Sequence, residues 1–419
     1  MTPSPFRVLP CFIQLKSLRS SDTQRSESMA WRDLRLVKRL GLQVPVIQSP
    51  MAGLQASDLA IAVARGGGLG SIPCTVLSNE DMRRHVQHFR EATQASSSPV
   101  SLCQTLSAAD SDVNVHWQER LTPYYRKHGV EPAKIQDTMK LRMPFDESSL
   151  ELVRELRPEV VSFHFGLPPS ELLEGVKATD ALVISSATTV REALWLEARG
   201  CDAVIAQGVE AGGHRGVFLP REDAGSPPNP QDQQYRNSSM RFPRQVGTIA
   251  LVPQIVDAIN VPVIASGGIG DARGLLAASA LGAAAVQMGT VFLLADETNT
   301  SPLYRHALKR AASPDEEDTE TAITNVLSGR PARALVTRVV RELGPTCAAV
   351  PEFPWAVGAL RELQHSAEKA GDTSFSSFWS GQAVSFAKET SAESIVRSMA
   401  QELKELMKSM CDDEISSFP

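Results

Sequence analysis

The sequence predicts an α/β fold, a TIM (β/α)8 barrel with a smaller helical second domain. Short apolar segments rich in β-branched residues alternate with helical segments, and eight such strand–helix units follow one another from Pro45 onward. This alternation is typical of a parallel sheet, and eight units are the number that closes a barrel. A doubly wound open sheet is the structural alternative.

Each expected strand is a short apolar run that suits a buried parallel strand. The eight strands are expected at Pro45–Gln48, Leu69–Ile72, Val100–Cys103, Val160–Phe163, Ala181–Ser185, Ala203–Ala206, Val261–Ala265 and Ala285–Met288. The connection between the third and fourth strands, residues 104–159, contains two expected helices, Val113–Lys127 and Asp146–Arg157. A barrel connection of this length is usually a functional loop.

Glycines follow the last two strands, where a barrel of this type binds phosphate. The turn Ser266–Gly270 comes directly after the seventh strand, and Gly289 and Thr290 come directly after the eighth. Glycine lets the backbone approach a ligand closely, and the free N–H groups of the helix that follows favour an anion. The two turns together predict a phosphate site. Two ordinary βα turns in another α/β enzyme are the alternative.

Composition divides the chain into four parts. They are a disordered extension at 1–33, the barrel at 34–312, a helical cap domain at 321–387, and a C-terminal helix with its tail at 388–419. Within the barrel, residues 220–243 are rich in Pro, Asn, Gln and Ser and are expected to form a disordered insertion. The cap domain rests on two segments with a helical pattern, Thr321–Pro345 and Phe353–Ala370.

Charge and composition exclude several classes of protein. The 42 Lys and Arg residues against 48 Asp and Glu residues give a formal net charge of −6, so nothing favours binding to nucleic acid or to an anionic membrane. No apolar run reaches the roughly 18 residues of a transmembrane helix. The six scattered cysteines form no CxxC pair, which argues against a zinc site and favours a reducing, cytoplasmic setting. The apolar and basic residues of Phe6–Leu18 leave a mitochondrial location as the alternative.

Polar residues that could carry chemistry follow several of the strands. His164 ends the fourth strand between two phenylalanines, whose rings would desolvate the imidazole, lower its pKa and favour the neutral base. A hydrogen-bonded core histidine is the alternative. After the sixth strand, Gln207–Gly216 offers an amide for a heterocycle edge, paired glycines, and positive charge from His214 and Arg215. His, Cys, Asp and Glu form no cluster with metal-ligand spacing, so no metal is expected.

Several longer motifs are shared with a known family. They are PVIQSPMAG (Pro45–Gly53), VVSFHFG (Val160–Gly166), Ser185–Gly216 with its AQGVEAGGHRG ending, PVIASGGIGDARG (Pro262–Gly274), GAAAVQMGTVFLL (Gly282–Leu294), TNVLSGRPARALV (Thr324–Val336) and FSSFWSGQ (Phe375–Gln382). With these motifs the chain resembles the nitronate monooxygenases, formerly called 2-nitropropane dioxygenases. The resemblance covers roughly Leu34 to Gln382.

The resemblance implies an FMN-dependent enzyme that uses O2 to oxidise alkyl nitronates, or more broadly nitroalkanes, to a carbonyl compound and nitrite. His164 matches the catalytic histidine of the family, and we expect it to act as base on the carbon beside the nitro group or to hydrogen-bond the nitronate. His214 is expected to stabilise a negatively charged flavin. The implied FMN contacts are Met51, Ala52, Gly53, Gln207, Gly212, Gly213, Gly267, Gly268, Gln287, Met288, Gly289 and Thr290.

One stretch departs from the family pattern. The family usually has an Asn that touches the flavin from the third strand, whereas Ser101 or Cys103 stands there in this chain. This departure leaves open a flavin-binding barrel without oxygenase turnover. A related barrel flavoenzyme, an FMN-dependent enoyl thioester reductase that uses NAD(P)H, is the other alternative.

Overall fold

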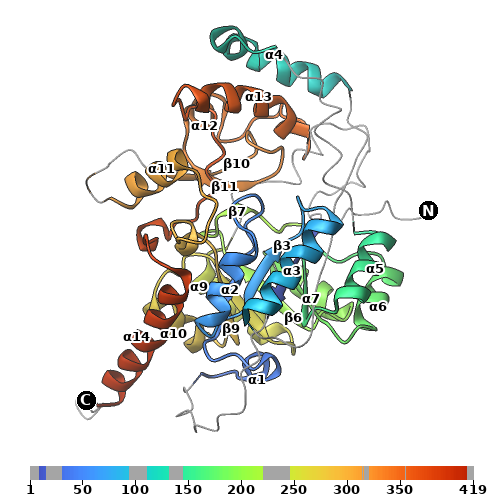
Figure 1. Ribbon diagram of the computed structural model, residues 1–419, viewed down its shortest axis with the longest axis vertical. Helices are drawn as coiled ribbons and strands as arrows, with labels where there is room; N and C mark the ends of the chain where they lie inside the picture. The colour runs from blue at the N-terminus through green and yellow to red at the C-terminus, as the bar shows by residue number, and fades with distance from the viewer. Residues whose placement is uncertain are drawn as a thin grey trace.

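The computed structural model describes residues 9–15, 31–93, 111–131, 145–219, 246–313, 315, 320–353 and 355–412. A barrel makes up the larger part of the molecule, and a smaller cap lies above it (Figure 1). The barrel strands are β1 (Leu9–Leu15), β2 (Val46–Gln48), β3 (Gly70–Pro73), β4 (Val160–His164), β5 (Leu182–Ala187), β6 (Ala203–Gln207), β8 (Val263–Ser266) and β9 (Ala285–Met288). The seven expected strands that fall within the described residues are all present, each within two residues of its predicted bounds.

These strands form one curved sheet in the order β2-β9-β8-β6-β5-β4-β1-β3. The six strands from β2 to β4 in that order run parallel. Leu69, directly before β3, pairs in parallel with Ile47 of β2, which brings the two ends of the sheet together. The sheet is therefore TIM-barrel-like, and the carboxyl ends of its parallel strands meet at one end of the barrel.

The N-terminal segment corrects one prediction. Strand β1 lies between β3 and β4 and runs antiparallel to both, so a disordered extension over 1–33 is wrong for this stretch. Its sequence, LPCFIQL, is apolar and contains strand-favouring Phe and Ile, and its backbone pairs with two strand edges that would otherwise be open. The predicted third strand, Val100–Cys103, lies outside the described residues, as does the insertion at 220–243.

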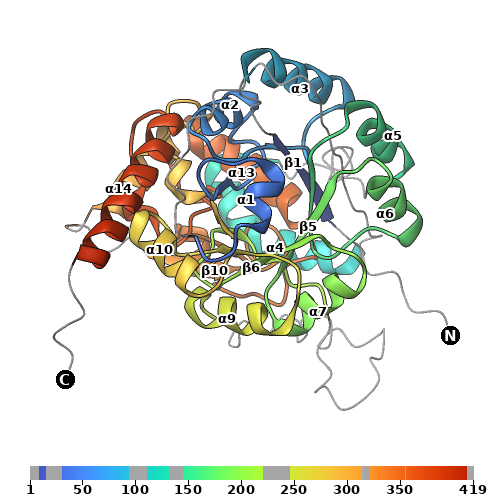
Figure 2. The same ribbon diagram turned by 90° about the horizontal axis from the view of Figure 1, so that it is seen from below.

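Helices surround the barrel in a ring that is seen from below (Figure 2). They are α2 (Ser57–Arg65), α3 (Asn79–Thr93), α5 (Glu147–Leu156), α6 (Ser170–Lys177), α7 (Val190–Ala198), α9 (Thr248–Ala258), α10 (Ala272–Ala280) and α14 (Ala392–Asp412), with α1 (Arg35–Leu40) across the bottom. Helix α14 is the predicted C-terminal amphipathic helix. It packs between α10 and α2 and buries Val396 and Leu403 there, so it takes the place of the helix that would follow the last strand.

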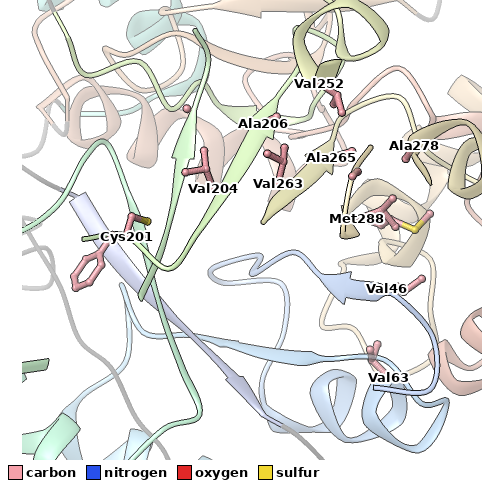
Figure 3. Packing of buried hydrophobic residues seen from close by; sticks show 14 of the residues in the cluster. Val46, Val63, Cys201, Val204, Ala206, Val252, Val263, Ala265, Ala278 and Met288 are labelled. Carbon is pink, nitrogen blue, oxygen red and sulfur yellow. The ribbon is translucent and has the colours of Figure 1, made fainter. Parts of the chain in front are cut away.

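The core lies between the sheet and this ring of helices. Val204 of β6 pairs with Val263 of β8, and Ala206 pairs with Ala265 two residues further along (Figure 3). All four side chains are buried. Strands that are buried on both faces read as continuous apolar runs, which is why the periodicity identified them from sequence. No helix of the described residues is long and apolar enough to cross a membrane.

The cap combines helices with a small sheet. Its elements are α4 (Ser111–His128), β7 (Gly213–His214), β10 (Thr321–Thr324), β11 (Ala332–Leu335), α12 (Arg338–Leu343) and α13 (Trp355–Lys369), which α11 (Pro302–Ala312) and the short helices η3 (Thr290–Phe292) and η4 (Val384–Phe386) join to the barrel. The three strands pair antiparallel in the order β10-β11-β7. Helix α4, from the long connection after β3, packs on α13.

The predicted helix over Thr321–Pro345 is wrong for its first half, which is the hairpin β10–β11. Gly329 has a φ of 85° in the loop of this hairpin, and Pro331 follows it. A left-handed glycine and a proline so close together interrupt a helix. The predicted helix over Phe353–Ala370 is confirmed as α13.

Candidate active site

A cavity opens at the carboxyl ends of the parallel strands, beneath the cap. Its volume is about 260 Å³, close to the lower limit of the roughly 300–1,000 Å³ that ligand sites usually have. The predicted residues on its wall are His164, Met51, Ala52, Gln207, Gly212, Gly213, Gly267, Gly268, Gln287, Met288, Gly289 and Thr290. Gly53 is not on that wall and lies in the exposed turn beside Met51.

The glycine turn after β8 has the unusual backbone that a ligand cradle needs. Gly267 and Gly268 have φ values of 115° and 72°, a region that side chains other than glycine rarely adopt. A Cβ on Gly267 would lie 3.0 Å from the backbone nitrogen of Ala211. The backbone conformation therefore requires glycine at both positions, and at Gly267 there is also no space for a side chain. Both residues face the cavity, as do Gly289 and Thr290.

The sequence predicts free N–H groups at the start of the helix that follows this turn. In the structure, carboxylate side chains accept hydrogen bonds from such groups at the nearby helix ends. Asp271 caps α10 and accepts hydrogen bonds from the backbone nitrogens of Arg273 (3.0 Å) and Gly274 (3.2 Å). Glu210 similarly accepts from the backbone nitrogen of Thr248 at the start of α9 (2.9 Å). These carboxylates satisfy first-turn donors of both helices. Anion binding at this end of the cavity therefore depends on the glycine turns.

Gly212 has a second role beside the approach of a ligand. A Cβ on Gly212 would lie 2.5 Å from the backbone nitrogen of Gly381 and 2.7 Å from the carbonyl carbon of Ser380. The nitrogen of Gly381 in turn donates a hydrogen bond to the hydroxyl of Thr290 (2.9 Å). The FSSFWSGQ stretch thus packs, backbone against backbone, over the turns that follow β6 and β9.

His164 is held by hydrogen bonds at both ring nitrogens. Its Nε2 lies 3.2 Å from the carbonyl oxygen of His214, and its Nδ1 lies 3.0 Å from the hydroxyl of Ser186. A carbonyl oxygen can only accept, so the proton belongs on Nε2, and Nδ1 accepts from the Ser186 hydroxyl. Burial lowers the pKa of His164 to about 3, and repulsion by Arg330 and Arg215 acts in the same direction. The predicted neutral imidazole agrees with this geometry.

Aromatic side chains from both parts of the molecule line the cavity. The His214 ring lies 5.1 Å from that of Phe353 and 5.2 Å from that of Trp379, both of which belong to the cap. Phe165 adds a third ring, and the guanidinium of Arg330 stacks over it at 3.6 Å. Strand β7 thus carries His214 to a position between these rings and not to a solvent-facing loop.

Arg215 lies beneath the turn after β6. It is 1% exposed and donates to the carbonyl oxygens of Gln207 (2.7 Å) and Gly208 (2.6 Å). Burial lowers the pKa of its guanidinium to about 9, so the group is still positive at neutral pH. Arg333 donates to the next carbonyl, that of Val209 (3.0 Å). Two buried cations therefore fix three successive carbonyls below the cavity floor.

Comparison with known proteins gives the family. The sequence profile of the nitronate monooxygenases matches residues 34–402. A nitronate monooxygenase from Pseudomonas aeruginosa is 38% identical over 374 residues, which are 88% of this chain and 99% of that protein. Another from Paraburkholderia phytofirmans is 35% identical and covers 88% of this chain and 95% of its own. The chain belongs to the nitronate monooxygenase family.

Solved structures agree with this assignment. The crystal structure of nitroalkane oxidase from Streptomyces ansochromogenes superposes with a TM-score of 0.74 and 30% identity, covering 90% of this chain and 99% of its own. FabK from Thermotoga maritima superposes with a TM-score of 0.62 and 26% identity, covering 90% and 98%. Both superpositions cover 90% of this chain, so the shared fold includes the barrel and the cap.

Two glutamines on the cavity wall differ in whether their side-chain amides are fully hydrogen-bonded within the protein. The amide of Gln207 is used within the protein: its Nε2 donates to the carbonyl of His214 (2.9 Å), and its Oε1 accepts from the backbone nitrogen of Gly216 (2.7 Å). By contrast, Oε1 of Gln287 is buried without a hydrogen-bond partner among the described residues. An orphaned acceptor on a cavity wall suits a ligand that carries an N–H group.

Sequence reasoning missed the aromatic residues that the cap contributes. The sequence pattern places Phe353 at the start of a predicted helix, and it places Trp379 in a family motif to which no role is assigned. The only signal for Trp379 was its place in the FSSFWSGQ stretch. Within the described residues, His, Cys, Asp and Glu form no group that could hold a metal ion.

Proposed function

We propose that this protein catalyses the FMN-dependent oxidation of alkyl nitronates by O2, giving a carbonyl compound and nitrite. Membership of the nitronate monooxygenase family supports the reaction class. The single observation that carries the proposal is the cavity itself, which joins left-handed glycine turns at one end to a neutral, doubly hydrogen-bonded His164 at the other.

The residues on the cavity wall fit FMN. Gly267, Gly268, Gly289 and Thr290 would hold the phosphate, at the place where barrels of this kind bind it. The orphaned Oε1 of Gln287 would accept from a ring N–H of the flavin. When bound, FMN supplies the electron transfer between substrate and O2, while the protein orients the partners and tunes the local charge.

His164 has the geometry of a hydrogen-bond donor rather than that of a base. The lone pair on Nδ1 already accepts from Ser186, and a pKa of about 3 makes this imidazole a weak proton acceptor. A nitronate has already lost its carbon proton, so its oxidation needs no base. The long Nε2–H bond to His214, 3.2 Å, leaves that hydrogen available for sharing with a nitronate oxygen. These contacts favour nitronates as substrates over neutral nitroalkanes, for which His164 would have to act as base.

The apolar rings on the cavity wall suit the alkyl part of such a substrate. Phe165 offers flat apolar surface beside His164, and Phe353 and Trp379 offer it beside His214. Burying an alkyl chain against such rings contributes about 0.8 kcal/mol per CH2 group. We therefore expect longer primary alkyl nitronates to bind more tightly than short ones until the space is filled.

The decisive experiment is an absorbance spectrum of the purified protein, followed by anaerobic additions. We expect a flavin spectrum that is bleached by an alkyl nitronate and restored by O2 with release of nitrite. The parent nitroalkane should bleach it far more slowly. His164→Asn should lower kcat/KM for the nitronate.

Each rival has its own outcome. Bleaching by NADH with turnover of an enoyl thioester would replace the proposal with a reductase. Tightly bound FMN without nitrite would leave a flavin-binding barrel. Fast nitroalkane turnover that His164→Asn abolishes would make His164 the base. A colourless protein that FMN cannot reconstitute would end the flavoenzyme assignment.

A further inference from the structure

Glu192 is a buried carboxylate to which the proposed function assigns no role. It lies in the first turn of α7 and is 1% exposed. Its Oε2 accepts from the backbone nitrogen and the hydroxyl of Thr188, both at 2.7 Å. Its Oε1 accepts from the backbone nitrogens of Phe218 (2.8 Å) and Leu219 (3.3 Å). A buried carboxylate is tolerated only with such partners, and here they join the turn after β5 to a distant segment.

That segment, residues 213–219, lies against His164. The carbonyl oxygen of His214 is the acceptor for Nε2 of His164. A Cβ on Gly216 would lie 3.1 Å from Cε1 of the same ring, so backbone and imidazole are in close contact. The position of this segment therefore decides whether Nε2 of His164 has an acceptor and whether water reaches the ring.

The segment is held at both ends. Near its start, β7 pairs with β11, and the Gln207 side chain bonds to His214 and Gly216. Near its end, Arg330 donates to the carbonyl of Val217 (2.7 Å), and Glu192 accepts hydrogen bonds from the backbone nitrogens of Phe218 and Leu219. Glu192 is thus the carboxylate that ties the end of the segment to the barrel wall.

We propose that Glu192 is a positioning residue that holds residues 213–219 against His164 and so keeps the imidazole proton on Nε2. The effect on turnover rests on the proposed function, whereas the place of the proton is a property of the protein alone. Each carboxylate oxygen of Glu192 accepts from two donors. A glutamine would replace one of these oxygens with an NH2 group, which cannot accept, and the hydrogen bonds to that oxygen would be lost. An aspartate would keep the charge but shorten the reach.

The charged groups around His164 set the direction of the change. Arg330 and Arg215 repel a proton on the ring, and Ser186 and the His214 backbone bond to its nitrogens. Burial is the main reason for the low pKa of His164, so loosening the segment would admit water and raise that pKa towards its ordinary value.

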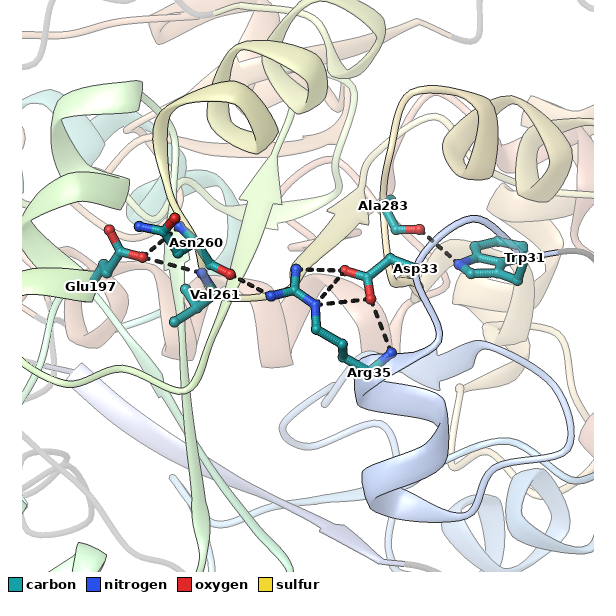
Figure 4. A network of polar contacts seen from close by, with 7 residues as sticks. All are labelled: Trp31, Asp33, Arg35, Glu197, Asn260, Val261 and Ala283. Carbon is teal, nitrogen blue, oxygen red and sulfur yellow. Dashed lines mark hydrogen bonds and ion pairs between the residues drawn. The ribbon is translucent and has the colours of Figure 1, made fainter.

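The test compares Glu192→Gln and Glu192→Asp with a matched control, Glu197→Gln. Glu197 lies on the same helix and also accepts from two backbone nitrogens, those of Asn260 and Val261, but at the other end of the barrel (Figure 4). The readout is the 15N NMR spectrum of histidine-labelled protein over pH 5 to 8, with His164→Asn assigning the signal. We expect wild type and Glu197→Gln to keep the proton on Nε2 without titrating. Glu192→Gln should titrate in this range, and Glu192→Asp should show part of the change.

Kinetics give a second readout. At the ordinary histidine pKa of about 6.5, roughly nine imidazoles in ten are protonated at pH 5.5 and nearly all are neutral at pH 8. Both forms carry the Nε2–H donor, and the protonated form adds a positive charge beside the anionic nitronate. The ratio of the kcat/KM of Glu192→Gln to that of wild type should therefore be higher at pH 5.5 than at pH 8, whereas the ratio for Glu197→Gln should not change. A changed NMR titration without nitrite from any variant would support the positioning and refute the proposed function. A His164 that keeps Nε2 protonated and does not titrate in either Glu192 variant would overturn the positioning.

Discussion

The two ends of helix α7 each carry a glutamate that bonds to the backbone of a distant segment. Glu192, at the cavity end, is 1% exposed and makes four hydrogen bonds. Glu197, at the opposite end, is half-buried and makes two, to Asn260 and Val261. Water can replace the partners of Glu197 but cannot reach those of Glu192. Glutamate thus fixes the position of a backbone segment at the cavity end of α7, whereas at the opposite end it adds only modest stability to the fold.

The wider surroundings show the same contrast. At the bottom, Arg35 pairs with Asp33 at 2.7 Å and donates to the carbonyl of Asn260, with 59% of the Arg35 side chain exposed (Figure 4). Beside it the indole of Trp31 donates to the carbonyl of Ala283 (2.7 Å). At the cavity end the comparable cation, Arg215, is buried. Exposed pairs are screened by water, whereas buried ones act at full strength on their neighbours.

The largest effect is expected from replacing a glycine. The cavity end and the bottom of the barrel each contain a glycine that has no room for a side chain. Gly212→Ala would place a Cβ 2.5 Å from the backbone of Gly381, and neither backbone can move without disturbing the turns on the cavity wall. We expect the purified variant to lose its FMN. The matched variant is Gly282→Ala at the bottom, where the Cβ would lie 2.9 Å from the side chain of Val256. It should lower Tm yet keep a full flavin spectrum, and equal flavin loss in both variants would contradict the comparison.

The next effect is on acid stability. His164 is neutral in the folded protein down to about pH 3 but takes up a proton near pH 6.5 when unfolded. Its contribution is therefore complete above pH 6.5 and is lost as the pH falls, at about 1.4 kcal/mol per pH unit, or about 2 kcal/mol by pH 5. Urea unfolding at pH 7 and pH 5 should show this loss in wild type, and His164→Gln should reduce it by that amount.

A second histidine serves as the control for that measurement. Burial also lowers the pKa of His85, which lies on the outer helix α3 and is only half-buried. We expect His85→Gln to reduce the acid-induced loss by less than His164→Gln does. If the free energy of unfolding falls equally between pH 7 and pH 5 in wild type and in His164→Gln, His164 is hydrated in the folded protein.

How much the sequence predicts also differs between short and long range. The strands, the glycine turns and the position of His164 at the end of β4 followed from apolar periodicity and from residues close together in the chain. The bond from Glu192 to Phe218 spans 26 residues and has no local signature. The aromatic walls from Phe353 and Trp379 depend on how the cap sits over the barrel. Pairing of β1 between β3 and β4 likewise depends on a contact that no local pattern encodes.

The smallest expected effect is at the bottom of the barrel. Arg35→Ala removes an exposed ion pair with Asp33, which stabilises a protein by at most about 1 kcal/mol, and less in high salt. We expect a small fall in the free energy of unfolding in urea at low ionic strength, an even smaller one in 1 M salt, and no change in the flavin spectrum or in the titration of His164. Because α7 and the barrel strands connect the two ends, a change in that titration would show that the bottom network transmits strain to the cavity. The contrast between the two ends would then describe their exposure but not their independence.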